Sequence, residues 1–307
     1  EFFGSVQMEL FLQHVLNGIT LGSIYALIAL GYSIVYGILK MINFAHSDVY
    51  MVGAFACFYA ARWLGLELHP GILSFLTLLV IAMVSCSVLG VVIERLAYRP
   101  LRNGPKLNIL ITAIGVSLFL EYSGQVVFGA SPQVFPEVIK EKVYGEAGAF
   151  QLRSFDVTVI LTTVIAMLVL HRLIKKTKTG IAMRAVSNNA TVAGLMGINV
   201  DRIITFAFVL GSSLAGVGSL LVGLKYPKID PLMGMMIGLK AFVAAVLGGI
   251  GHLPGAVLGG LVMGLSEEMV VAYVSSTYRD ALAFGILIII LLFKPEGLMG
   301  KPSIEKV

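Results

Sequence analysis

The sequence predicts an all-α integral membrane protein with about eight to ten transmembrane or broken helices. Of its 307 residues, 58% are hydrophobic and only 13% are charged, and the mean hydropathy is +0.93. Soluble domains carry about 25% charged residues, so this composition suits a chain that is surrounded by lipid. The 34 glycines suit membrane helices whose backbones approach one another closely.

The apolar stretches that predict these helices run through residues 10–38, 44–61, 71–93, 107–128, 157–170, 203–224, 235–250, 255–274 and 281–293. The stretch 71–93 has no charged residue and is long enough to cross about 30 Å of hydrocarbon with some tilt. Residues 1–7 precede Met8 and lack the pattern of a signal peptide, so we predict a non-native or extended N-terminus there.

Charges between the stretches predict the orientation of the chain. Basic residues outnumber acidic ones in segments 94–106 and 172–202, whereas segment 129–156 has a slight excess of acids. By the positive-inside rule, both basic segments are cytoplasmic and the segment between them faces outward. Parity then places the C-terminus inside, with Lys294, Lys301 and Lys306, and the N-terminus outside. The net charge of +5 is therefore assigned to orientation and not to nucleic-acid binding.

Polar or glycine-rich residues interrupt the helical pattern at 41–50 and at 246–255. Backbone groups freed inside a membrane must be satisfied by protein or by water in a cavity. Broken helices at corresponding places in two related halves are typical of a translocation path. The candidates are Asn43, His46 and Asp48 at the first break, and Gly249 and Gly251 at the second. A pair of ordinary interhelix turns is the alternative.

Side chains at the first break either line a path or hold the break together by hydrogen bonds, and we favour the second role. Glu121 lies in the middle of the stretch 107–128, and a carboxylate at that depth is a functional candidate unless it is paired. Lys240 lies less deep, and we expect it either to reach the membrane interface or to pair with such an acid. One of Glu267 and Glu268 must face protein. Small residues four apart predict two helix-packing faces: Gly211, Ala215 and Ser219, and Ala256, Gly260 and Gly264.

Several chemical motifs do not occur in the sequence. There is no phosphate-binding loop of the Walker type, no metal-ligand spacing and no serine in a nucleophile turn. Cys57 and Cys86 both lie in apolar stretches and predict neither a disulfide framework nor a metal site. The sequence therefore predicts no enzyme activity, no cofactor and no metal.

Segment 172–202 is too polar to span a membrane but contains helix formers and cap signals. Thr191 is predicted to cap a short helix that ends at Gly197. Short helices on the cytoplasmic face suit a membrane subunit that docks onto an ATPase. A surface helix pair without a partner is the alternative.

The chain resembles the permeases of branched-chain amino acid ABC importers, and most closely the shorter of the two permeases in such a system. The resemblance extends over nearly the whole chain from Met8, in the family's order. It rests on residues 42–54 (INFAHSDVYMVGA), 179–190 (TGIAMRAVSNNA), 193–198 (AGLMGI), 240–251 (KAFVAAVLGGIG), 254–256 (PGA) and 294–300 (KPEGLMG). Ser47 departs from the family, which usually has glycine after the histidine, so a positive φ at that position is doubtful.

The resemblance implies a heteromeric importer with an ABC importer permease fold of two structurally related halves. A second homologous permease, two ATP-binding subunits and a soluble extracytoplasmic binding protein would complete it in the cytoplasmic (inner) membrane of a prokaryote. Residues 8–302 would form one multi-pass permease domain with a cytoplasmic coupling loop at 175–202, and 303–307 a cytoplasmic tail. The residues assigned to ATPase coupling are Gly180, Arg184, Asn188, Ala193 and Gly197.

The function that the resemblance implies is passage of branched-chain or other hydrophobic amino acids, with ATP hydrolysed by partner subunits. Related permeases also serve urea and short amides, and the sequence does not separate these solutes. Two further alternatives are an ion-coupled secondary transporter, in which Glu121 or Asp48 would bind the ion, and a structural or receptor subunit without a path.

Overall fold

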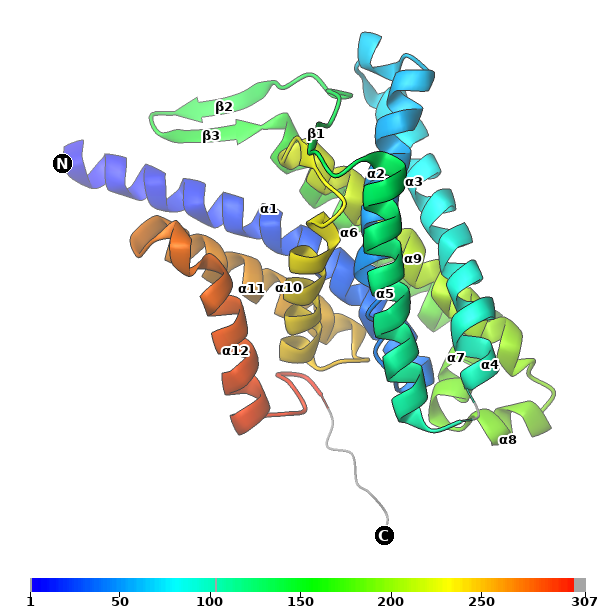
Figure 1. Cartoon of the computed structure of the whole chain (residues 1–307). Helices are drawn as coiled ribbons and strands as arrows, with labels where there is room; N and C mark the ends of the chain where they lie inside the picture. The colour runs from blue at the N-terminus through cyan, green and yellow to red at the C-terminus, as the bar shows by residue number, and fades with distance from the viewer. Residues whose placement is uncertain (1, 103, 301–307) are drawn as a thin grey trace. The chain divides into compact units, whose positions relative to one another are not determined.

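The computed structural model describes residues 2–102 and 104–300 (Figure 1). In this part of the chain, seven helices are long and apolar enough to cross a membrane. They are α1 (Phe2–Leu39), α3 (Ile72–Ile93), α5 (Lys106–Phe128), α6 (Ser154–Lys176), α9 (Val200–Lys225), α11 (Leu253–Tyr273) and α12 (Arg279–Phe293), the last together with η3 (Ser276–Tyr278). Shorter helices α2 (His46–Trp63) and α10 (Met233–Gly248) adjoin the two interruptions. The prediction of a helical membrane fold with broken helices is confirmed.

The remaining helices are short and lie between the spans: η1 (Leu66–Leu68), η2 (Glu94–Tyr98), α4 (Arg99–Leu101), α7 (Lys178–Asn188) and α8 (Ala190–Leu195). Helix α1 begins at Phe2 and so includes residues 2–7. The tail at 303–307, together with Lys301 and Lys306, lies outside the described residues.

Within residues 2–102 and 104–300, four short strands depart from a purely helical chain. Strand β1 (Gln133–Val134) pairs antiparallel with β4 (Lys228–Ile229), and β2 (Val143–Ala147) pairs antiparallel with β3 (Phe150–Arg153). Three of the four lie in segment 129–156, which we predicted to be a loop outside the membrane. Open strand edges need water or protein partners, so such strands belong outside the hydrocarbon region.

The chain forms two compact units that interleave along the sequence. Unit 1 contains residues 1–33, 141–163 and 240–307, and unit 2 contains residues 34–140 and 164–239. The first interruption of the helical pattern lies in unit 2 and the second lies in unit 1. That the units are structurally related halves remains a prediction.

Small residues bring the helices of unit 2 together. A Cβ atom added at Gly216 of α9 would meet the backbone of Ala82 in α3, and one added at Gly53 of α2 would meet Ser219. The predicted packing face of α9 is buried throughout, from Gly211 to Ser219. This face is confirmed, because only small side chains leave room for helices at this separation.

Small residues also allow close helix packing in unit 1, where α1 crosses α11. A Cβ atom added at Gly22 would lie 2.8 Å from the Cα of Leu261, and one added at Gly264 would meet the backbone of Gly22. Gly260 likewise approaches Ala26, so the second predicted packing face is confirmed.

Candidate functional site

Helices α7 and α8 lie between α6 and α9, and side-chain caps fix their ends. Thr177 accepts a hydrogen bond from the backbone N–H of Gly180 at 3.0 Å, which caps α7. Asn189 accepts from the N–H of Val192 at 3.0 Å, which caps α8. The prediction that Thr191 caps this helix was wrong, because the asparagine two residues earlier already occupies that role and Thr191 lies in the first turn. Gly197 ends the segment with φ +84°, as predicted.

The two faces of α7 differ in chemistry. Gly180, Met183 and Val186 are buried, and a Cβ atom at Gly180 would run into backbone carbonyls of α6. Arg184 and Asn188 are exposed on the other face. Of the residues predicted for coupling, these two are free to contact a partner, whereas Gly180, the buried Ala193 and Gly197 shape the helices themselves.

Large apolar side chains project from α8 and the turn that follows it. Val192, Leu195 and Met196 are 52%, 83% and 79% exposed. They lie in the most polar and basic part of the chain, which we predict to face the cytosol. An apolar patch in such a place is typical of a protein–protein contact.

A hydrogen bond connects α7 to the end of α1. The hydroxyl of Ser187 donates to the backbone carbonyl of Gly37 at 2.5 Å. Gly37 lies in the last turn of α1, where carbonyl groups have no intrahelical partner. Three residues later, Lys40 has φ +54° and is the one non-glycine residue with positive φ in the described chain. The helix therefore ends in a conformation that a side chain adopts at a cost.

The first break is also held from the end of α3, where the helix loosens into the π-helical turn η2. The Tyr98 hydroxyl at the end of η2 donates to Oδ1 of Asn43 at 2.8 Å. Buried Glu94 at its start accepts from the hydroxyl of Thr205 in α9 at 2.9 Å. Single π-helical turns inside α-helices frequently mark functional sites.

Two arginines after η2 pair with the first turn of α9. Arg99 and Arg102 both donate to the carboxylate of Asp201. Asp201 lies in the first turn of α9, so this pairing joins the start of α9 to α4 and to the residue that follows α4. Figure 1 shows α4, α7 and α8 gathered at one end of unit 2. Sequence reasoning missed Tyr98, Ser187 and Asp201 as partners, because each depends on contacts between distant segments.

Within α2, Asp48 is fully buried and accepts a hydrogen bond from the hydroxyl of Ser117 in α5 at 2.6 Å. His46 is 1% exposed at the start of the same helix. Ser47 is helical, and so the doubt about a positive φ there was justified. Glu121 is 7% exposed and lies one turn beyond Ser117 on α5.

Lys240 pairs with other acids than Glu121. Its ammonium lies 3.0 Å from Glu267 and 2.7 Å from Asp280, all within unit 1. The prediction that Lys240 pairs with a buried acid is confirmed, and that acid is Glu267. Both Glu267 and Glu268 are buried, and Glu268 lies 3.2 Å from Nδ1 of His14.

The second break is a true interruption, as predicted. Helix α10 ends at Gly248 and α11 begins at Leu253, with φ +102° at Gly249 and +88° at Gly251. The C-terminal segment folds back onto the break. Its backbone N–H groups at Leu298 and Met299 donate to the carbonyls of Leu247 and Gly248, at 2.8 and 3.1 Å. The glycines therefore provide backbone geometry here and bring no side chain to a path.

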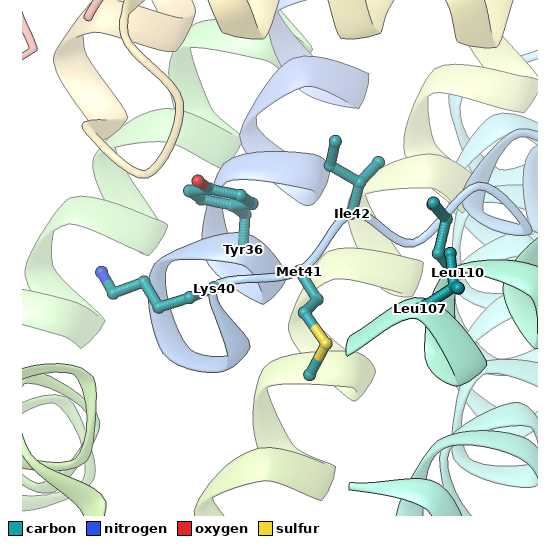
Figure 2. Close-up of a pocket in the computed structure, with 6 residues that line it drawn as sticks. All are labelled: Tyr36, Lys40, Met41, Ile42, Leu107 and Leu110. Carbon is teal, nitrogen blue, oxygen red and sulfur yellow. The ribbon is translucent and has the colours of Figure 1, made fainter. Parts of the chain in front are cut away.

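A cavity of about 390 Å³ lies beside the first break. Its lining comes from the end of α1, the residues after it and the start of α5, as Figure 2 shows: Tyr36, Lys40, Met41, Ile42, Leu107 and Leu110. Lys40 is the one charged group in this lining. Among the described residues, no cluster of histidine, cysteine or acidic side chains could hold a metal ion.

Comparison with known proteins gives the family. A family model described as "Branched-chain amino acid transport system / permease component" matches residues 14–291. The permease protein LivH of a high-affinity branched-chain amino acid transport system from Escherichia coli strain K12 is 43% identical over 307 residues, which cover 99% of this chain and 100% of that protein. BraD, the corresponding permease protein from Pseudomonas aeruginosa, is 41% identical and covers 97% of this chain and 98% of its own.

More distant similarities cover most of the chain as well. The permease protein LivM of Escherichia coli is 22% identical over 93% of this chain and 70% of its own length. The solved structure of PsaBC from Streptococcus pneumoniae in complex with Fab aligns over 96% of both chains with a TM-score of 0.48 and 13% identity. The family match and the full-length identities agree with the motifs, and this chain belongs to the family of branched-chain amino acid transport system permease components.

Proposed function

We propose that this chain is a permease subunit of an ABC importer for branched-chain amino acids, in the inner membrane of a prokaryote. Identity of 43% with LivH over the full length is the observation that carries this proposal. The similarity to LivM supports a second, homologous permease as partner. Two ATP-binding subunits hydrolyse ATP, and a soluble binding protein delivers the solute from outside.

The structure supports α7 and α8 as the surface that meets the ATPase. Their exposed residues Arg184, Asn188, Leu195 and Met196 are available to a partner. Helix α7 is also bonded through Ser187 to Gly37, in the last turn of α1 before the first break. Movement of α7 would thereby reach the end of α1 directly.

Reconstitution of the importer in proteoliposomes tests the proposal. Leucine uptake should require internal ATP, both ATPase subunits and the binding protein. Arg184→Ala and Asn188→Ala should lower uptake per ATP hydrolysed while the complex still assembles. Full uptake without ATP or without the ATPase subunits would refute the proposal and favour an ion-coupled transporter.

The apolar patch gives a separate test of docking. Burying a leucine side chain contributes about 1.5–3 kcal/mol, so Leu195→Ser should weaken ATPase binding roughly 10- to 100-fold. Thr191→Ala, an exposed change in the same helix, is the matched control and should bind normally. Equal binding by both variants would exclude α8 from the interface.

A further inference from the structure

Two buried carboxyl groups of unit 2 lie near each other without a positive partner. Asp48 is 0% exposed and Glu121 is 7% exposed. Ser117, whose hydroxyl donates to Asp48, lies one turn before Glu121 on α5, so the two carboxyl groups are neighbours. Among the described residues, neither takes part in an ion pair. Buried carboxylates are normally paired, and inside a membrane protein an unpaired one is a candidate functional group.

One carboxylate oxygen of Asp48 has no hydrogen-bond donor. Oδ2 of Asp48 accepts the hydrogen bond from Ser117, but Oδ1 is buried and has no hydrogen-bond partner in the structure. An acceptor that is desolvated and left unbonded destabilises the protein. A cationic donor at this position would bond to Oδ1 and offset the repulsion between Asp48 and Glu121.

Helix α5 carries residues of both the carboxyl pair and the cavity lining. Leu110 lines the cavity, and Ser117 follows it two turns later on the same helix, about 10 Å further along the axis. Leu110, Ser117 and Glu121 recur at helical spacing, so they share one face of α5. Glu121 and the cavity-lining Leu110 therefore lie along the same face of α5.

We propose that Asp48, Glu121 and Ser117 bind the ammonium group of the transported amino acid. An ammonium group has three donors, and the site offers three oxygen-bearing side chains to receive them. The inference rests on the proposed function and narrows it, because urea and simple amides carry no such charge. The site selects for a primary ammonium group, whereas the binding protein selects among the side chains attached to it.

Proteoliposomes containing the whole importer test this site through Asp48→Asn and Glu121→Gln. Asp48→Asn should lower leucine uptake at least tenfold, whereas ATP hydrolysis stimulated by the leucine-loaded binding protein should stay within twofold of the parent protein. Asp48→Glu should recover part of the uptake, since it restores the charge. The control is Glu67→Gln, which removes an exposed carboxylate from η1 and should leave uptake unchanged.

The measured uptake either supports or overturns the proposed ammonium site. Uptake at the parent rate by both Asp48→Asn and Glu121→Gln would overturn the inference. A tenfold dependence of the parent protein's uptake on sodium or on a proton gradient would also overturn it, because the carboxyl groups would then hold an ion. If Asp48→Asn does not assemble, Glu121→Gln and Ser117→Ala are measured in its place. Each should lower leucine uptake relative to ATP hydrolysis, and an unchanged ratio would overturn the inference. Absence of leucine uptake by the parent protein would instead refute the proposed function.

Discussion

Replacing Lys240 with methionine tests how much the buried ion cluster of unit 1 contributes to stability. Glu267 is 1% exposed, and a hydroxyl and two cationic groups lie beside its carboxylate. The hydroxyl of Tyr25 lies 2.8 Å from one oxygen, and the ammonium of Lys240 lies 3.0 Å from the other. Nε of Arg279 lies 3.1 Å from that second oxygen. Four helices, α1, α10, α11 and α12, therefore meet at one carboxylate.

The loss of stability in Lys240→Met depends on the charged groups that remain around Glu267. Removing one partner of a buried ion pair destabilises a protein by about 3–5 kcal/mol, because the other charge is left uncompensated. Arg279 remains beside Glu267, so we expect the low end of that range, about 3 kcal/mol. Asp280 also loses its partner, but its side chain is 49% exposed, and water compensates it. Tyr25→Phe removes only a hydroxyl donor and should cost about 1–2 kcal/mol.

Equilibrium unfolding in mixed detergent micelles, followed by circular dichroism, measures these differences. The double variant Lys240→Met/Glu267→Gln removes both charges and should regain part of the loss, since paired removal of a buried ion pair is often nearly neutral and Arg279, which also loses its partner, is 35% exposed to water. A loss below about 1 kcal/mol for Lys240→Met alone would show that Glu267 does not depend on this lysine. A double variant less stable than the single one would refute the reasoning as well.

Three further changes test the backbone and the first break. Gly22→Ala should lower thermal stability in detergent, because its Cβ would overlap the backbone of α11, whereas Gly115→Ala meets nothing within 4 Å and should raise stability by up to about 1 kcal/mol. Lys40→Gly should raise the free energy of unfolding by up to about 1 kcal/mol by relieving its positive φ, and a decrease would contradict the strain. Tyr98→Phe removes the hydrogen bond to Asn43 and should cost about 1 kcal/mol of stability. It should lower uptake in proteoliposomes while the complex still assembles, and uptake equal to that of the parent protein would show that η2 does not take part in coupling.

The sequence predicts those features whose signal is local. Both interruptions were located correctly because glycine, proline and polar residues break an apolar period within ten positions. Gly197 was identified as a helix end, and Ser219, which Gly53 of α2 approaches closely, lies on the face of α9 for which small-residue spacing predicted close packing. Each of these depends on the shape or conformational freedom of single residues, which composition along one helix reveals.

Features that depend on distant partners were not predictable in this way. The sequence predicts that Lys240 can pair with an acid, but only the folded chain identifies Glu267 and Asp280 as its partners. Strands β1 and β4 have two residues each, too few for a period, and they pair across more than one span. The cap of α8 was misassigned because asparagine and threonine are both good N-cap residues and lie two positions apart.

The two breaks satisfy the free carbonyl groups at their helix ends with different hydrogen-bond partners. A helix that ends inside a membrane protein leaves carbonyl groups that must be bonded. At the second break, backbone N–H groups of Leu298 and Met299 bond those carbonyls, and the glycines leave no room for alternatives. At the first break, the partner is a side chain, Ser187, which belongs to the proposed ATPase-docking helix. A hydroxyl can release a carbonyl by a rotation about one bond, whereas backbone pairing must unfold a segment. We therefore expect the first break to move during the transport cycle and the second to act as its fixed counterpart, and hydrogen exchange should be faster at residues 40–45 than at 247–252 in the assembled importer.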